Sequence, residues 1–500
     1  MNRAGLDGGV FFGRDETTGR EADLPRLLAM LDACGVERAL ATAYRAIWFD
    51  DREGNATMRN AAARSGGRLV PMAAINLTRH DPFDGHLEQV KRDGFAAIAL
   101  VAGVFGWTLQ DYAFRSLARK AATLDLPLQL CVRERRDLAA AADAAGAAGG
   151  NVMIRWMRGG GYTNLPDLLA IARDCPRFLF DVATITQSGG IAHLVERIGP
   201  DRLFVASSAP NAHAGAGWFM LSASGLDAET RRLIGGANLA RVLGLREPDA
   251  APEPPAWRTL SRTPKIDTHW HTSGWNLVEP RTGFADLSAS MRGYALTRAV
   301  TSSIRALSDS LEAGNAETAE FLAHEERARG LVVVNPRRPE ASIGEIERWR
   351  AHPGFVGAKT IQDFYGLGLD DPAYRPILAH LSTIPGFPIK AHLPGLREAA
   401  IAHPDLQFVA AHSTWRHREL AALPNVWFDI ATSSGLVDES DIGDLIAAVG
   451  HDRVLFSSDA PLMDPAWTLG KLALLDLSEL ALDAILRSNA PRAFPRMVTP

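Results

Sequence analysis

The sequence has few cysteines, and they are not arranged for pairing or for metal binding. Cys34, Cys131 and Cys175 are the whole set, and no two of them stand at the short spacing of a metal or redox motif. Small secreted domains that depend on disulfides use many closely spaced cysteines. The sequence therefore argues against a disulfide framework, and we expect a reducing, cytoplasmic location.

Long apolar runs are also missing. The uncharged stretch SSAPNAHAGAGWFMLSASGL, residues 207–226, is interrupted by Ser, Asn, His and Gly, whereas a membrane-spanning helix needs about 20 mainly apolar residues. The first residues, MNRAGLDGGVFFGRDE, return to charge at Arg14 before an apolar segment long enough for a signal peptide has formed. We expect no membrane segment.

The chain shows no large excess of charge. Its formal net charge is −5, and its lysines and arginines are dispersed, so no basic stripe is present for a nucleic-acid backbone. With 500 residues, of which 47% are hydrophobic and 22% charged, the chain is too long for one compact core. Two domains of about 200 to 250 residues are the natural expectation.

The two halves of the chain are similar to each other. Residues 246–264, REPDAAPEPPAWRTLSRTP, are rich in Pro and Ala and are typical of a linker. On either side of them, motifs recur in the same order: DGFAAIAL and PGFVGAKT, FLFDVAT and VWFDIAT, IGPDRLFVASSAP and VGHDRVLFSSDAP. Such ordered matches predict a tandem duplication. We therefore expect domains at 1–245 and 265–500, joined by the linker.

Each half alternates short β-rich runs with longer amphipathic stretches. Runs such as RLVPMAAIN and GLVVVN are followed by segments such as FDGHLEQVKRDG and IGEIERWRAH. This alternation predicts a parallel sheet covered by helices. About eight such units in each half favour two tandem (β/α)8 barrels, arranged as a pseudo-dimer, over the alternative of open doubly wound sheets.

In the second half, polar side chains follow several predicted strands. His269 and His271 end the first strand, where a period of two directs both side chains to one face. His392, His412 and Asp459 follow later strands, so all five should meet at one rim of the barrel. A single histidine at a strand end is more often a hydrogen-bonding residue than a ligand. The HxH pair together with the later residues favours a metal site.

The set IDTHWH, IKAHL, VAAHS and SSDAP, closing with SNAPRAF, resembles the amidohydrolase superfamily, in particular the amidohydrolase-related branch that holds aminocarboxymuconate-semialdehyde decarboxylase. The resemblance spans residues 265–496 and, more weakly, the first half. It implies a single divalent ion, Zn²⁺ or alternatively Mn²⁺, as the cofactor. It implies His412 as a catalytic residue that hydrogen-bonds water on the ion and moves its proton, with Asp459 sharing that task. The implied ligands are His269, His271, His392 and Asp459.

The sequence signals for substrate-binding residues are less specific than those for the metal ligands. Lys359 in GFVGAKT could contact the substrate, form an ion pair or bridge two metals as a carbamate, whereas Lys390 suits a buried pairing partner. Arg305 could bind a substrate carboxylate through its planar fork, or it could be structural. Trp275 and Trp415 follow strand ends and could line the pocket, although core or lid packing explains them equally well.

The first half lacks the histidines of the second. Gly9 and Phe11 stand where His269 and His271 stand, Cys131 and Trp156 replace His392 and His412, and Ser208 replaces Asp459. We therefore expect a non-catalytic barrel that replaces a dimer partner. Arg133, Arg155 or Arg158 could reach the other pocket. The alternative is that this barrel binds a regulatory small molecule.

Together these features predict a metal-dependent hydrolase. Metal-activated water would cleave an amide, lactone or ester bond of a small-molecule substrate in the second barrel. The first alternative is non-oxidative decarboxylation of an unsaturated or aromatic acid, with Arg305 or Lys359 holding the carboxylate. The second alternative is a binding or scaffold protein without catalysis. Neither nucleic acid nor a membrane is expected as a partner, and the sequence leaves further oligomerisation open.

Overall fold

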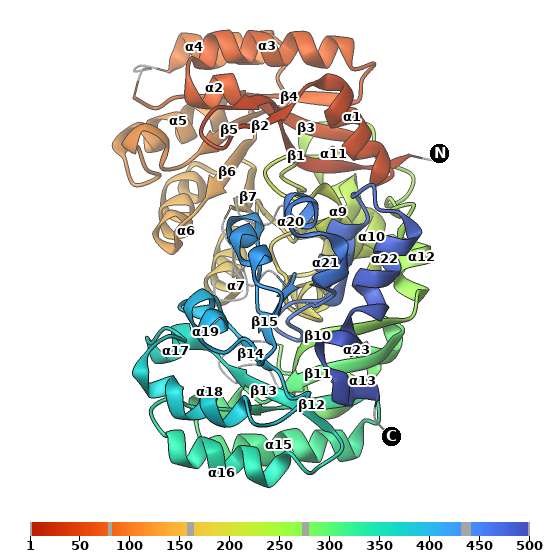
Figure 1. Cartoon of the computed structure of the whole chain (residues 1–500). Helices are drawn as coiled ribbons and strands as arrows, with labels where there is room; N and C mark the ends of the chain where they lie inside the picture. Colours follow the sequence, from red (N-terminus) through yellow and green to blue (C-terminus); the bar gives the residue numbers. More distant parts are fainter. Residues whose placement is uncertain (1–2, 79–82, 158–164, 273–279, 432–441, 499–500) are drawn as a thin grey trace. The chain divides into compact units, whose positions relative to one another are not determined.

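The computed structural model describes residues 3–78, 83–157, 165–272, 280–431 and 442–498. It divides into two compact units, and the chain passes from the first to the second between Trp257 and Arg258 (Figure 1). The expected linker, residues 246–264, contains the short helix α12 (Trp257–Arg262). The pseudo-dimer arrangement of the two units stays a prediction.

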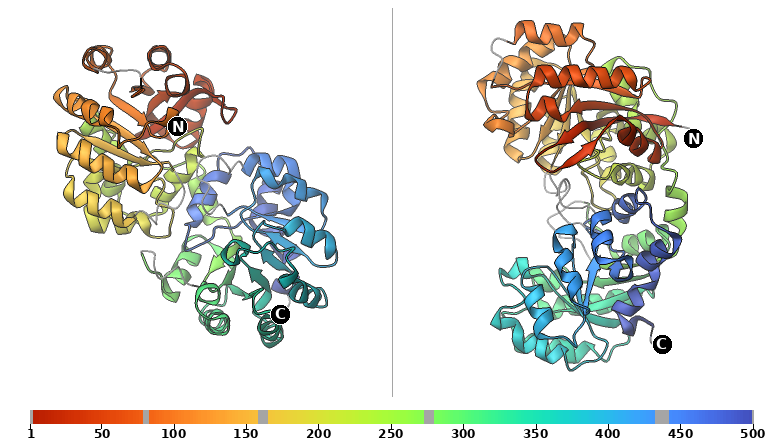
Figure 2. Two further views of the ribbon diagram at one scale, coloured as in Figure 1. Left: turned by 90° about the vertical axis from the view of Figure 1, so that its left-hand side faces the viewer. Right: turned by 45° about the horizontal axis from the view of Figure 1, so that its top comes forward.

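The first unit alternates strands with helices, as Figure 2 also shows. Its strands are β1 (Ala4–Asp15), β2 (Arg20–Ala22), β3 (Val36–Ala43), β4 (Leu69–Ala74), β5 (Ala97–Val101), β6 (Leu128–Val132), β7 (Val152–Trp156), β8 (Phe178–Asp181) and β9 (Leu203–Phe204). Its helices are α1 (Leu24–Ala33), α2 (Tyr44–Trp48), α3 (Asp51–Arg64), α4 (Asp84–Arg92), α5 (Tyr112–Thr123), α6 (Arg135–Ala141), α7 (Leu165–Asp174), α8 (Gly190–Ile198), α9 (Ala214–Ala223), α10 (Ala228–Arg232) and α11 (Asn238–Leu243).

The second unit repeats this alternation. Its strands are β10 (Lys265–His271), β11 (Leu296–Ser302), β12 (Ala328–Val333), β13 (Phe355–Thr360), β14 (Ile389–Ala391), β15 (Phe408–Ala410), β16 (Val426–Asp429) and β17 (Val454–Leu455). Its further helices are α13 (Phe284–Gly293), α14 (Arg305–Ser308), α15 (Leu311–His324), α16 (Pro339–Trp349), α17 (Gln362–Tyr365), α18 (Arg375–Leu381), α19 (Leu396–Ala402), α20 (Ile442–Val449), α21 (Pro465–Leu472), α22 (Glu479–Asp483) and α23 (Ala490–Ala493).

Both sheets run in chain order with parallel neighbours, except for the short β2, which pairs antiparallel with β1. Backbone hydrogen bonds also join the first strand of each unit to the residue that directly follows the last strand of the same unit. Thr268 N donates to Phe456 O at 3.0 Å in the second unit, and Gly8 N donates to Val205 O at 2.7 Å in the first. These bonds join the two ends of each sheet. The α/β fold of TIM-barrel type is thereby confirmed.

Inside the second barrel, apolar residues fill the amino-terminal ends of the strands and polar residues gather at the carboxyl ends. Val300, Leu331 and Val356 belong to a buried cluster with Phe494. Each such side chain contributes on the order of 2 kcal/mol when it is removed from water. The strand alternation that directs them inward also directs the polar residues that follow toward the barrel mouth.

The same hydrogen bonds recur in both units. In α3, Asn55 donates from Nδ2 to Ala74 O at 2.8 Å and accepts from Ala74 N at 2.9 Å. In α15, Asn315 makes the same pair of bonds with Val333, at 3.2 and 2.8 Å. In each unit one buried asparagine therefore ties a helix to the third strand of the barrel, counted without β2.

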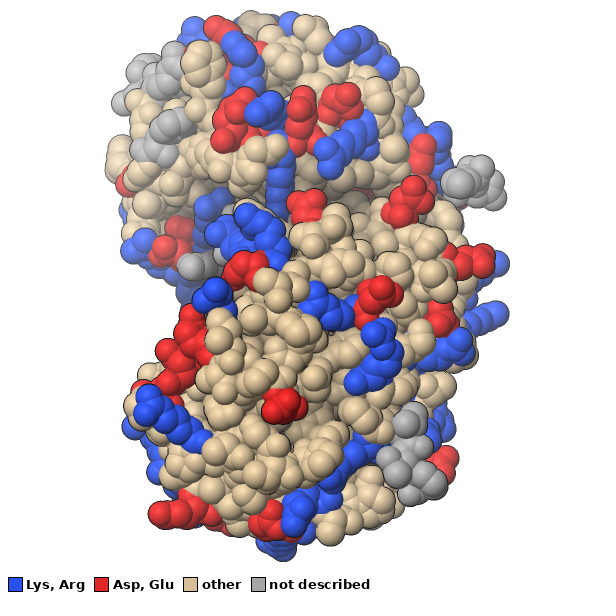
Figure 3. Space-filling model, in the orientation of Figure 1, with Lys and Arg blue, Asp and Glu red and all other residues tan. Residues whose placement is uncertain are grey.

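Acidic and basic side chains are interspersed on the face drawn in Figure 3. Every helix within the described ranges is too short or too polar to cross a bilayer.

Candidate metal centre

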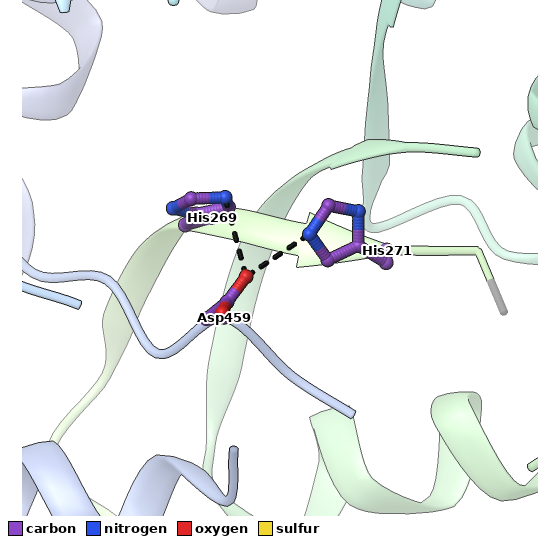
Figure 4. Close-up of side chains that lie close together, drawn as sticks. All are labelled: His269, His271 and Asp459. Carbon is purple, nitrogen blue, oxygen red and sulfur yellow. Dashed lines mark hydrogen bonds and ion pairs between the residues drawn. The ribbon is translucent and has the colours of Figure 1, made fainter. Parts of the chain in front are cut away.

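Three buried side chains converge at the carboxyl end of β10. His269 and His271 extend from one face of the strand, and Asp459 follows β17 with a φ of +73° (Figure 4). Nε2 of His269 lies 3.3 Å from Oδ1 of Asp459, and Nε2 of His271 lies 3.0 Å from the same oxygen. Within the described residues these three form the one group of His, Cys, Asp and Glu side chains that could hold a metal ion.

Both histidines turn Nδ1 away from this group. Nδ1 of His269 lies 2.7 Å from Oδ2 of Asp429, and Nδ1 of His271 lies 3.2 Å from the carbonyl of Ser302. An oxygen acceptor at Nδ1 keeps the proton there and leaves the Nε2 lone pair available. Nε2 of His271 and Oδ1 of Asp459 are then two acceptors facing each other at 3.0 Å. Such a pair requires a proton or a cation, so the donor set fits a divalent ion.

Electrostatics keep this group in the state that a metal requires. Burial lowers the pKa of His269 well below its ordinary value, and the charge of Lys359 adds to this effect. Burial raises the pKa of Asp459, whereas a proton on His269 or His271 would lower it below the ordinary range. A neutral imidazole and an ionised carboxylate are the forms that ligate metal ions.

Asp429, at the end of β16, is a central residue that the sequence analysis did not select. Its carboxylate forms a fully buried ion pair with Lys390, and Oδ1 accepts from Ser457 Oγ at 2.5 Å. Burial raises the pKa of Asp429, yet Lys390 and His269 hold it well below its ordinary value. The motif FDIAT, repeated as FDVAT in the first half, was the available signal. The expected role of Lys390 as a buried pairing partner is confirmed.

Lys359 lies beside the candidate metal ligands. Its Nζ donates to Nε2 of His269 at 3.1 Å, and no carboxylate in the described parts of the chain forms an ion pair with it. Burial, with the charge of Lys390, lowers the pKa of Lys359 to about 7. Of its three predicted roles, the ion pair finds no support, whereas contact with a substrate and a bridging carbamate stay predictions.

The other two histidines extend the cluster. The ring centroid of His412 lies 4.9 Å from that of His269 and 4.8 Å from that of His392. Nδ1 of His412 lies 2.8 Å from the carbonyl of Ala431, whereas Nδ1 of His392 lies 2.7 Å from Asp363. His392 is not a member of the group of three, so its role as a ligand stays a prediction.

The remaining predicted site residues take other positions. Arg305 opens α14 with its side chain 52% exposed and paired with Asp309 at 2.9 Å, which is the arrangement of a surface ion pair. Trp415 begins the 3₁₀ helix η7 (Trp415–Ala422), and the guanidinium of Arg418 lies 4.8 Å from the ring centroid of Trp415. Trp275 lies outside the described residues.

In the first unit, an arginine occupies the middle of the barrel. Arg155, on β7, is 1% exposed, and its Nη2 donates to Ser208 Oγ at 2.6 Å and to Gly9 O at 3.1 Å. Its Nη1 donates to Gln129 Oε1 at 2.9 Å, and its guanidinium lies 5.4 Å from the Phe11 ring centroid. The expectation that Arg155 could reach the other pocket is therefore wrong, because its guanidinium is fixed inside its own barrel.

The prediction that Arg133 or Arg158 reaches the pocket of the second barrel stays a prediction. Arg133 is exposed, and Arg158 lies outside the described residues.

One family model and several solved structures are similar to parts of this chain. The amidohydrolase family model matches residues 266–496. Solved structures similar to this chain include 2,6-dihydroxybenzoate decarboxylase in complex with 2,6-dihydroxybenzoate, at 15% identity over 48% of this chain and 99% of the other, with a TM-score of 0.41. A putative 2-pyrone-4,6-dicarboxylic acid hydrolase from Pseudomonas putida matches at 16% identity over 49% of this chain and 98% of the other, with a TM-score of 0.40.

A third solved structure, 5-carboxyvanillate decarboxylase from Novosphingobium aromaticivorans with manganese, matches at 17% identity over 41% of this chain and 78% of the other, with a TM-score of 0.33. A search of curated proteins found no match. The family model carries the assignment, and it covers the segment that contains the three converging side chains. Residues 266–496 match the amidohydrolase family, and this match supports an enzyme of that superfamily.

Proposed function

We propose that the second unit is a metal-dependent hydrolase that cleaves an amide, lactone or ester bond of a small molecule. The observation that carries this proposal is the convergence of two imidazole nitrogens on one carboxylate oxygen, within a buried site at the barrel mouth. His269, His271 and Asp459 would hold one divalent ion, Zn²⁺ or Mn²⁺, with His392 as the fourth proposed ligand. A bound ion would polarise a carbonyl group and lower the pKa of water.

The chain's own residues would orient the substrate and move protons. His412 donates from Nδ1 to the Ala431 carbonyl, so its Nε2 can accept a proton. It stands next to His269, within reach of the proposed reaction centre. We assign His412 the role of general base, with Asp459 assisting, and Lys359 the role of hydrogen-bond donor to a substrate oxygen.

Lys359 also supports a second candidate, non-oxidative decarboxylation. A buried ammonium that has no carboxylate partner in the described chain is suited to hold the carboxylate of a substrate. Arg305 does not support this reaction, since its charge is already paired with Asp309 at the surface. The two reactions would use the same ligands and differ in the product that is released.

We further propose that the chain arose by duplication and that its first barrel is non-catalytic. The recurring asparagine bonds of Asn55 and Asn315 support the duplication. A second matched pair also supports it, since Asp7 Oδ1 accepts from Gly9 N at 2.9 Å, and Asp267 Oδ1 accepts from His269 N at 3.0 Å. Gly9 is thus the proposed counterpart of His269.

On this correspondence, Arg155 fills the place of the metal ion. Its guanidinium contacts Gly9, Phe11 and Ser208, the counterparts of His269, His271 and Asp459. A β-carbon at Gly9 would lie 2.1 Å from Nη1 of Arg155, so a histidine there would require the guanidinium to move. The guanidinium of Arg155 would therefore supply the positive charge in the first barrel. With the second barrel as the one proposed metal site, we expect a single metal ion per chain.

The first experiment is elemental analysis of the purified chain, followed by assays with lactone, ester, amide and hydroxybenzoate substrates. We expect about one Zn or Mn per chain, and acid release without CO2. Release of CO2 would replace hydrolysis by decarboxylation. No metal after reconstitution, with no turnover of any of these substrates, would contradict both candidates.

A further inference from the structure

A pocket of about 690 Å³ opens at the amino-terminal end of the second barrel. Ile266, at the start of β10, lines it, while His269 and His271 lie three to five residues further along the same strand. At about 3.3 Å per residue this separation is roughly 10 to 17 Å. The pocket is therefore distinct from the candidate metal centre, although both belong to one barrel.

Two arginines on neighbouring strands line this pocket. Arg298 is two residues before Val300 on β11, and Arg329 is two residues before Leu331 on β12; both apolar residues belong to the buried core. Since side chains two apart share a face of a strand, both arginines extend toward the barrel interior at its amino-terminal mouth. The remaining lining residues, besides His352, include the apolar Leu322, Pro353, Pro491 and Met497, and none is acidic.

Neither guanidinium has an acidic partner in the described parts of the chain. Arg298 donates to the carbonyl of Thr297 at 2.7 Å, and Arg329 donates to the carbonyls of Glu326 and Ala328 at 2.9 and 2.8 Å. Burial lowers the pKa of Arg329, and the charge of Arg298 lowers it further. Two adjacent cations without a counterion are unfavourable unless an anion joins them.

The first barrel shows how such an arginine is neutralised. Arg38, the counterpart of Arg298, donates to the carbonyl of Arg246 at 2.6 Å and lies 3.7 Å from the carboxylate of Glu37. Thr297 stands where Glu37 would be, so the second barrel lacks that charge. Val70 stands in place of Arg329 and packs against the buried core of the first barrel, which Val242, Leu243 and Leu245 also cover. The second barrel thus has an arginine on its third strand where the first has a valine, and it lacks the carboxylate that Glu37 supplies to Arg38 and Arg246.

We propose that this pocket binds a small organic anion, whose carboxylate or phosphate group joins Arg298 and Arg329 and whose apolar body contacts Leu322 and Met497. A planar guanidinium fork binds both oxyanions through paired hydrogen bonds. The volume lies within the usual range for small-molecule sites. The comparison with Arg38 uses the proposed correspondence of the two barrels, but the binding itself does not depend on catalysis at the metal centre.

The test is titration calorimetry on the full chain with benzoate, phenyl phosphate, inorganic phosphate and the neutral benzamide. The protein carries His269→Ala and His271→Ala, so that anions cannot bind a metal at the other end of the barrel. We expect at least one oxyanion to bind and benzamide not to bind. Preference for benzoate or for the phosphates identifies the group. If none of the three oxyanions binds, the proposal fails, whatever the outcome for hydrolysis.

A double variant, Arg298→Gln with Arg329→Gln in the same background, should weaken binding by about tenfold or more. The matched control is Arg487→Gln, because Arg487 is exposed, pairs with Asp483 and does not line the pocket. Equal affinity in the double variant would overturn the proposal.

Hydrogen exchange can be measured on protein that keeps both Arg298 and Arg329. This measurement therefore does not depend on whether the double arginine variant folds. The anion should protect residues 296–298 and 352–354. Protection confined to the carboxyl ends of the strands would also overturn the proposal.

Discussion

Asp429 accepts a hydrogen bond from Nδ1 of His269 at 2.7 Å, and both side chains are almost fully buried. The same carboxylate is paired with Lys390. It therefore keeps the Nδ1 proton of His269 in place and leaves Nε2 facing Asp459. Asp429, which lies outside the group of three candidate ligands, thus orients a proposed ligand and neutralises a buried lysine.

Asp429→Asn should lower metal affinity about 10- to 100-fold, because an amide holds neither the proton of His269 nor the charge of Lys390 as a carboxylate does. Titration of the metal-free protein with Zn²⁺ measures this change. The matched control is Asp181→Asn, the corresponding substitution in the first barrel, which should leave metal affinity unchanged. Equal losses in the two variants would indicate a general effect on folding.

The double substitution His269→Ala with His271→Ala should abolish metal binding and activity while the fold persists. Two of the proposed ligands are removed, but the strand and its backbone bonds remain. Elemental analysis, turnover and circular dichroism test this together. The control is His380→Ala, which removes a histidine that pairs with Glu347 on the outer helices. Full activity in the double variant would refute the proposed metal centre.

Arg155→Met should destabilise the first barrel by about 2 to 4 kcal/mol, since Ser208, Gln129 and Gly9 would lose their buried donor. Metal content and kcat should stay unchanged, because the substitution lies outside the proposed catalytic barrel. Urea unfolding measures stability, and Arg173→Met, an exposed arginine paired with Asp174, is the control. A large loss of turnover without unfolding would make the first barrel part of the active site.

The stability of the first barrel should depend on pH through Asp181. Burial raises the pKa of this carboxyl to about 7, although the charge of Arg155 opposes the shift. In the unfolded chain the group ionises near pH ~4, so the folded state holds the extra proton between about pH 4 and 7. Stability should therefore fall as pH rises through that window, on the order of 1 kcal/mol per pH unit.

Asp181→Asn should remove this pH dependence because an amide does not ionise. The fold should tolerate the substitution, since the amide oxygen can still accept from Ala183 N and Ala206 N. Urea unfolding of both proteins at several pH values tests the expectation. Parallel pH profiles in the two proteins would show that Asp181 does not carry the effect.

Local sequence patterns predicted the barrel-type fold and the convergence of His269, His271 and Asp459. Strand alternation fixes which side chains share a face, and parallel strands end at one rim, so these residues had to approach one another. Asp429 was not predicted as a site residue, because an aspartate at a strand end is equally consistent with a turn. Only its buried partners reveal its role.

By itself, the sequence determined the alternation of strands and helices, the recurring motifs of the two halves and the family of the second half. These properties depend on residue order and local periodicity. The tertiary structure decided which partners the buried charges take: Lys390 pairs with Asp429, Lys359 contacts His269, and Arg155 fills the centre of its own barrel. Those pairings join residues far apart in the chain, and the energy of a buried charge depends on its neighbours in space.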